Sequence, residues 1–139
     1  MTGNKKKMID DEFTESIIGC AFKVYNALGS GFLENVYKKA LLIELKSAGL
    51  AAEEESPITV TYKEHNVGTF YADIVVDKRV ILELKAVDCI AKVHDIKVVN
   101  YLKATGIPIG LLLNFGSSSL QIKRKYRDPA NHGNPVILS

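Results

Sequence analysis

Three charged residues interrupt apolar segments whose composition is typical of core strands. Glu83 and Lys85 lie within the run Val80–Val87, and their spacing of two places both side chains on one face of a strand. Asp73 interrupts the preceding run, Phe70–Val76, in the same way. Charges on an otherwise apolar strand need a structural or chemical reason. These three residues are therefore the first candidates for a functional site.

The loop between the two runs predicts how the carboxylates meet. A three-residue loop over 77–79 pairs Val76 with Val80. Counting back along both strands then places Asp73 opposite Glu83, with Cβ atoms about 4.5–5.5 Å apart. Two carboxylates at this separation repel each other unless one is protonated or a cation lies between them. A hard divalent cation such as Mg²⁺, with Mn²⁺ as its substitute, satisfies the pair because it prefers oxygen ligands.

Lys85 adds a cation beside this predicted metal site. Its ammonium group would point at a metal-bound water or at an anionic substrate. The combination indicates metal-assisted attack of water on a phosphodiester, because the metal lowers the pKa of the water and the cations hold the charge that builds on the phosphorus oxygens. The alternative is a charge ladder on a solvated sheet face, and a spacing this short does not decide between the two.

Length and composition indicate one globular domain. The chain has 139 residues, a formal net charge of +2 and 47% hydrophobic residues. This length is enough to bury a single hydrophobic core and too short for two. The longest apolar run is shorter than the roughly 18 residues of a membrane span, and residues 1–10 lack the apolar region of a signal peptide. The two cysteines, Cys20 and Cys89, lie far apart without CxxC spacing, which excludes a four-cysteine metal cluster built by one chain. Their small number predicts that the protein is located in a reducing cytoplasm.

Hydrophobic spacing divides the chain into helices and strands. Apolar residues at steps of three and four predict helices over 14–28, 33–48 and 91–104. Two-residue alternation or continuous apolar character predicts strands over 58–62, 67–76, 80–87, 109–115 and 120–126. The domain organisation that follows is a disordered lead over 1–12, a single domain over 13–127 and a C-terminal tail over 128–139.

The connections predict the topology. Short loops after the first and second strands make the first three strands an antiparallel meander. The helix over 91–104 is a crossover, so the strands before and after it are parallel in one mixed sheet. The fold class is therefore α/β, with helices on the faces of the sheet.

A basic cluster marks the last predicted strand. Its members are Lys123, Arg124, Lys125 and Arg127. They could contact nucleic-acid phosphate. The alternative is a solvated edge strand that uses lysine and arginine to oppose aggregation.

Several motifs together resemble a known family. Asp73 followed by Glu83-Leu84-Lys85 is similar to the signature of the PD-(D/E)XK nuclease superfamily, and residues 31–37, GFLENVY, match the motif of its GxxExxY family. Further matches occur in order at residues 17–19, 93–94, 100–106 and 113–116. The resemblance covers about residues 17–127, and it implies a restriction-endonuclease-like core in which a meander, a crossover helix and further strands form the central sheet.

The resemblance also implies roles for individual residues. Asp73 and Glu83 resemble the direct metal ligands, with the backbone carbonyl of Leu84 as an additional oxygen. Glu34 resembles the helix-borne acid that completes the metal site, and Lys85 resembles the lysine that positions the attacking water. For Glu34 taken alone, the alternative is an acid favoured by the helix dipole at an N-terminus.

Accessory residues lie on the crossover helix. His94, Lys97 and Tyr101 follow at steps of three and four and mark one face that could look toward the strand carboxylates. His94 could cap the helix, support the site from behind or transfer a proton. The family usually has glutamine where this chain has Lys97, which could contact substrate phosphate or displace the metal by pairing with a carboxylate. Tyr37 is expected to pack beneath Glu34.

These inferences predict a Mg²⁺-dependent nuclease that hydrolyses DNA phosphodiesters. The alternative is a catalytically inactive module that keeps the nuclease fold and binds nucleic acid or a protein partner. The apolar residues 136–138 are compatible with a homodimer and also with a tail docked on a monomer. The sequence contains no motif from which a target sequence, or endonucleolytic against exonucleolytic cleavage, can be inferred.

Overall fold

A mixed sheet organises the chain in the computed structural model, which describes residues 2–127 and their side chains from residue 11 onward. Its strands lie side by side in chain order: β1 Ala52–Tyr62, β2 His65–Val76, β3 Val80–Lys85, β4 Ile109–Asn114 and β5 Gln121–Tyr126. The first three form an antiparallel meander, β3 and β4 are parallel, and β4 and β5 are antiparallel. The predicted meander, crossover and α/β class are confirmed.

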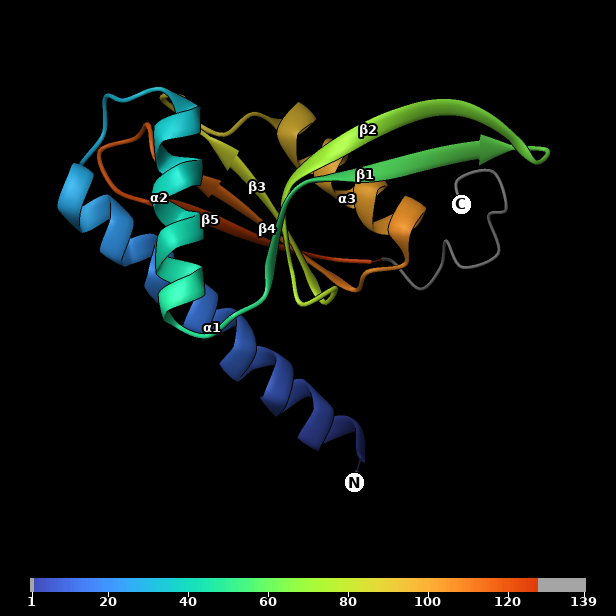
Figure 1. Cartoon of the computed structure of the whole chain (residues 1–139), viewed down its shortest axis with the longest axis horizontal. Helices are drawn as coiled ribbons and strands as arrows, with labels where there is room; N and C mark the ends of the chain where they lie inside the picture. Colours follow the sequence, from blue (N-terminus) through green and yellow to red (C-terminus); the bar gives the residue numbers. More distant parts are fainter. Residues whose placement is uncertain (1, 128–139) are drawn as a thin grey trace.

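Helices cover both faces of the sheet (Figure 1). The helices α1 (Thr2–Leu28) and α2 (Glu34–Ser47) pack on one face, and the crossover helix α3 (Lys92–Thr105) packs on the other. Alternate residues of β3 divide between these two layers, because Leu82 and Leu84 contact the α1–α2 side whereas Ile81 contacts α3. Among the described residues, no helix is long and apolar enough to cross a membrane.

The helix α1 is longer than the hydrophobic pattern predicts. It begins at Thr2, whereas the pattern predicts a helix from about residue 14 and a disordered lead over residues 1–12. The lysines, Met8 and Glu12 of this segment have good helix propensity, so they extend a helix that is anchored by buried residues such as Ile17 and Val24. The predicted tail over 128–139 lies outside the described residues, as do the apolar residues 136–138.

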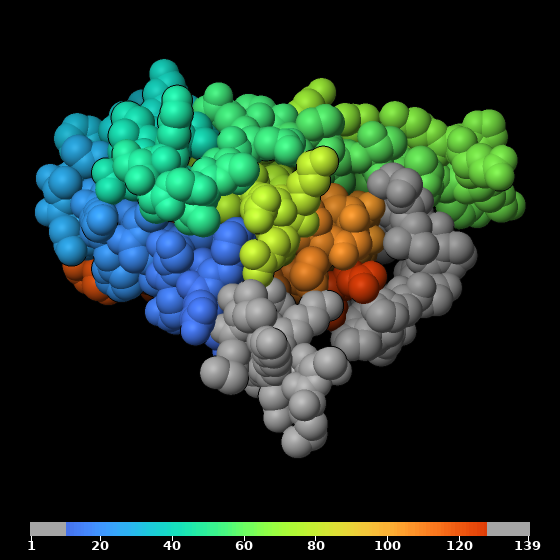
Figure 2. Space-filling model, turned by 60° about the horizontal axis from the view of Figure 1, so that its bottom comes forward, coloured from blue at the N-terminus to red at the C-terminus, as the bar shows by residue number. Residues whose placement is uncertain are grey.

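The first two strands form a long hairpin that curves away from the rest of the sheet. Its turn is Lys63-Glu64, with φ of 48° and 67°, whereas the sequence predicts a connection over 63–66. Positive φ at both turn residues is the geometry that matches the twist of a tight hairpin. β1 also begins at Ala52, whereas the sequence predicts its start at residue 58, so Glu53 is part of a strand. Pairing with β2 outweighs the low strand propensity of glutamate. Both views show the hairpin projecting past the helices (Figures 1 and 2).

A buried junction fixes the carboxyl end of β3 against the end of β4. The side chain of Asn114 is fully buried; its Oδ1 accepts hydrogen bonds from the N–H groups of Val87 and Gly116, and its Nδ2 donates to the Val87 carbonyl at 2.8 Å and to Gln121 at 2.7 Å. A Cβ atom at Gly116 would lie 2.4 Å from the Val87 nitrogen and 2.5 Å from the Ala86 carbonyl carbon. The backbone that follows Lys85 thus packs so closely against residue 116 that only glycine fits at that position.

We predict that Gly116→Ala lowers the free energy of unfolding by roughly 2 kcal/mol or more, because backbone must move to admit the methyl group. Gly19→Ala is the matched control, since a Cβ there meets nothing within 4 Å and its helical position favours alanine. Urea unfolding of both variants and the wild type checks the difference. A Gly116→Ala variant as stable as Gly19→Ala would contradict the close approach.

Candidate active site

The candidate site lies where β2 and β3 separate. Val76 pairs with Val80 as the sequence predicts, and the backbone pairing continues to Ile74 and Leu82. One residue further on, the carboxylate of Asp73 accepts a hydrogen bond of 2.9 Å from the N–H of Leu84. The side chain of Asp73 thus bonds to β3 just past the end of the backbone ladder, and this places it next to Glu83.

Glu83 is a buried carboxyl group within an apolar strand. It is 2% exposed, and its Oε1 has no hydrogen-bond partner among the described residues. Burial, a hydrogen bond to Asp73 and the charge of Asp73 raise the pKa of Glu83 to about 9, although Lys97 and Lys85 act in the opposite direction. In the absence of a cation, this carboxyl therefore keeps its proton at neutral pH.

Glu34 approaches the pair from the first residue of α2. Burial raises its pKa; Asp73 raises it further, while the nearby cations Lys85, Lys97 and Lys38 lower it. These effects show that Glu34 lies within electrostatic range of Asp73 and of Lys85. The structure therefore places Glu34 near Asp73 and Lys85. Within the described residues, however, it does not group Glu34 with Asp73 and Glu83 closely enough for the three carboxylates to hold one metal ion, contrary to what the resemblance implies.

Tyr37 determines where α2 begins. Its side chain is fully buried and stacks on Phe115, with ring centroids 4.7 Å apart. Its hydroxyl donates a hydrogen bond to the Gly29 carbonyl at 2.6 Å and accepts one from the N–H of Phe32 at 3.1 Å. The loop before Glu34 is therefore tied to the core, and Tyr37 has the packing role that the sequence predicts.

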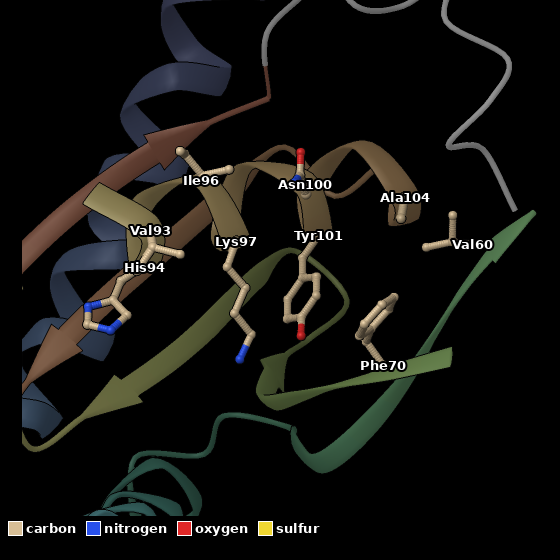
Figure 3. A pocket seen from close by; sticks show the side chains of 9 residues that line it. All are labelled: Val60, Phe70, Val93, His94, Ile96, Lys97, Asn100, Tyr101 and Ala104. Carbon is tan, nitrogen blue, oxygen red and sulfur yellow. The ribbon is translucent and has the colours of Figure 1, made fainter. Parts of the chain in front are cut away.

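Lys97 and Tyr101 extend from α3 toward the same site. Figure 3 shows the two side chains pointing the same way from the helix, and the Lys97 Nζ lies 5.5 Å from the centroid of the Tyr101 ring. Burial works against the charged form of Lys97, but Glu83, Tyr101 and Asp73 together raise its pKa. Burial raises the pKa of the Tyr101 hydroxyl, while Lys97 lowers it. Both residues face the strand carboxylates, as their helical spacing predicts.

His94 caps the crossover helix. Its side-chain Nδ1 accepts a hydrogen bond of 3.1 Å from the backbone N–H of Ala91, and the backbone N–H of His94 donates to the Ala91 carbonyl at 3.0 Å. Of the roles left open by the sequence, capping is the one with a hydrogen bond in the structure. The same side chain lines a groove beside the site.

The basic cluster on β5 is engaged in ion pairs within the chain. Asp95 of α3 contacts Lys123 at 3.1 Å and Lys125 at 3.7 Å. Arg124 contacts α1 at Asp11, Thr14 and Glu15. β5 is an edge strand of the sheet, as the structural alternative states, but three of the four cations considered for phosphate contact pair with residues of the helices instead of being solvated.

Two contributors to the site are assigned no role by the sequence analysis. Asn114 interrupts a continuous apolar strand, the same signal that identifies Asp73 and Glu83, and it holds the end of β3 as described above. Lys38 forms ion pairs with Glu54 and Glu55 and adds positive potential near Glu34 and Asp73. The partners of Lys38 come from another element, so no local pattern could have identified it.

The donor set suits a hard cation. Within the described residues, no three His, Cys, Asp or Glu side chains are grouped closely enough to hold a metal ion. Asp73 and Glu83 nevertheless provide adjacent carboxyl oxygens, one of them buried and without a partner. Oxygen-only donors and few protein ligands are typical of Mg²⁺, which keeps several waters, and not of structural zinc sites.

Comparisons with known proteins agree with this geometry. The sequence model of the PD-(D/E)XK nuclease superfamily matches residues 11–125, and together with the sheet topology this match confirms the restriction-endonuclease-like fold class. Among solved structures, the one titled "Crystal structure of SSO0001" matches with a TM-score of 0.52 and 16% identity, over 70% of this chain and 52% of that one. This chain thus spans about half the length of that protein, and the likeness concerns the fold alone. A search of curated proteins gave no significant match.

The raised pKa of Glu83 predicts how stability depends on pH. The folded, metal-free chain keeps this proton up to about pH 9, whereas the unfolded chain releases it near the ordinary value of 4.5. Because unfolding between these values releases a proton, the free energy of unfolding falls as the pH rises. Urea unfolding with a chelator at about pH 5.5, 7 and 8.5 should show a shallower decline for Glu83→Gln than for the wild type. Equal slopes would contradict the raised pKa.

Proposed function

The chain belongs to the PD-(D/E)XK nuclease superfamily, and we propose that it is a Mg²⁺-dependent nuclease that hydrolyses DNA phosphodiester bonds. The observation that carries the proposal is the buried, partly unpartnered carboxyl of Glu83 beside Asp73, with Lys85 two residues further along the same face. A structural ion pair would satisfy both oxygens of a buried carboxylate, whereas a site built for a cation leaves one oxygen available.

We assign the residue roles as follows from their positions. Asp73 and Glu83 would hold the cation, with the Leu84 carbonyl as a further oxygen and Glu34 approaching from α2. When bound, the cation would lower the pKa of a water molecule and polarise a phosphate oxygen. Lys85 would orient the attacking water and stabilise the charge that develops on the phosphate oxygens.

Residues 31–37 support the narrower assignment to the GxxExxY family, because Tyr37 and the turn at Gly31, with φ of 115°, together set the position of Glu34. A cytoplasmic location and a homodimer stay predictions from the sequence, which does not discriminate DNA from RNA as the substrate. Manganese is the substitute cation we propose for experiments, because it accepts the same oxygen ligands as Mg²⁺.

A specific observation favours the alternative of an inactive nuclease-fold module. The ammonium of Lys97 interacts electrostatically with both Glu83 and Asp73. A resident cation at this position partly replaces the charge that a metal ion would supply. In that case the chain would still bind nucleic acid or a protein partner, without hydrolysing it.

Lys97→Gln should therefore bind Mn²⁺ more tightly than the wild type, by roughly threefold to tenfold, because one competing positive charge is removed from a partly screened site. Isothermal titration calorimetry measures the change. The Asp73→Ala, Glu83→Ala double variant is the control and should lose the binding. Weaker Mn²⁺ binding by Lys97→Gln would show that Lys97 assists the cation instead of competing with it.

Lys85→Met tests catalysis separately from folding. If Lys85 orients the water, cleavage of supercoiled plasmid in Mn²⁺ should fall at least about a hundredfold. The melting temperature and Mn²⁺ affinity should stay near those of the wild type, because the side chains have similar length and the carboxylates are kept. A stable and equally active variant would defeat the mechanism. A wild type inactive with every divalent metal would favour the binding module.

A further inference from the structure

A groove of about 500 Å³ runs beside the candidate site, between α3 and the β1–β2 hairpin (Figure 3). We call it the α3–hairpin groove; its walls include Val60, Phe70, Val93, Ile96, Lys97 and Tyr101. Lys97 and Tyr101 belong to both the groove and the site, because they interact electrostatically with Glu83 and Asp73. A ligand strand with a phosphate at the carboxylates would therefore have its neighbouring nucleotide next to the groove.

The walls offer aromatic and apolar surface to solvent. Phe70 is 48% exposed, and its ring lies 6.1 Å from that of Tyr101 at an angle of 40°. Val93 and Ile96 on the adjoining helix are 65% and 50% exposed. An exposed ring face with apolar flanks suits a flat aromatic ligand, because stacking covers both surfaces at once.

The charge of the groove restricts the ligand further. Within the described part of the chain, no acidic side chain lines it, while Lys97 lines it and interacts electrostatically with the carboxylates of Glu83 and Asp73. An aromatic group attached to an anion satisfies both features, and a nucleotide has this composition. An apolar peptide would bring no anionic group to the Lys97 end of the site.

We propose that the α3–hairpin groove binds an unpaired nucleobase of the substrate strand, stacked on Phe70, so that the chain prefers single-stranded or locally unpaired nucleic acid to duplex. This inference rests on the proposed nuclease function and names its substrate class. A base within a duplex is stacked on both sides and hydrogen-bonded to its partner, so it can reach Phe70 only after unpairing. A single strand presents the base without that cost.

Phe70→Trp provides a direct readout, because the chain contains no tryptophan and the indole ring keeps the capacity to stack. A single-stranded oligodeoxynucleotide added in the presence of a chelator should quench the fluorescence of this residue. Tyr71→Trp is the matched control. Tyr71 is 55% exposed, lies outside the groove and points to the opposite face of β2. Its fluorescence should change little.

Binding measured by fluorescence anisotropy gives the magnitude. Phe70→Ala should bind the single-stranded oligodeoxynucleotide roughly tenfold more weakly than the wild type, within the range for loss of one base-stacking contact. Tyr71→Ala should bind like the wild type. Abasic sites throughout the oligonucleotide should remove the difference between Phe70→Ala and the wild type, and blunt duplex of the same length should bind more weakly than the single strand. Melting temperatures establish that each variant is folded; Phe70→Leu replaces Phe70→Ala if that variant is not.

The outcomes separate this inference from the nuclease proposal, because no step requires hydrolysis. Base-dependent quenching by a chain that never cleaves would support the groove and refute the nuclease. If Phe70→Ala cleaves like the wild type and the chain binds duplex as tightly as single strand, the proposal of base binding in the groove is wrong and the nuclease proposal stands. Fluorescence of Phe70→Trp that depends on protein concentration and not on oligonucleotide would show an interface between copies of the chain, which also overturns the inference.

Discussion

The carboxyl group of Glu83 is 2% exposed, and the surrounding structure has to offset the free-energy cost of removing it from water. The backbone ladder between β2 and β3 stops at Ile74 and Leu82, and beyond it Asp73 bonds to the N–H of Leu84. The gap between these strands is thus filled by carboxyl groups and not by backbone pairing. Glu34, Lys85 and Lys97 reach it from three different elements.

The elements around this gap are fixed by buried polar side chains whose hydrogen bonds are internal. Tyr37 joins the loop before α2 to the core, and Asn114 joins the segment after β3 to the end of β4. Both lie near the site without belonging to it. They limit the positions that Glu34 and Lys85 can take, as the proposed orientation of a water molecule by Lys85 requires.

The site could be predicted from the sequence where local rules act together. A short loop and two-residue alternation fix the register of Val76 with Val80, and the crossover helix makes β3 and β4 parallel. Prediction fails where distant residues decide the outcome. The pairing of Lys123 with Asp95 joins residues 28 apart, and β1 begins earlier than predicted because β2 pairs with it. The α3–hairpin groove depends on the curvature of the hairpin, which no local pattern specifies.

The ion pairs of β5 also bear on how binding would respond to ionic strength. Lys123, Lys125 and Arg124 are already paired with carboxylates of the same chain, so the net positive charge with which they could displace the cations condensed around a polyanion is reduced. The entropy of releasing such counterions is the usual source of steep salt dependence in nucleic-acid binding. A chain that relies on a few cations near the carboxylates and on ring stacking should therefore hold its ligand with an affinity that changes only gradually with salt.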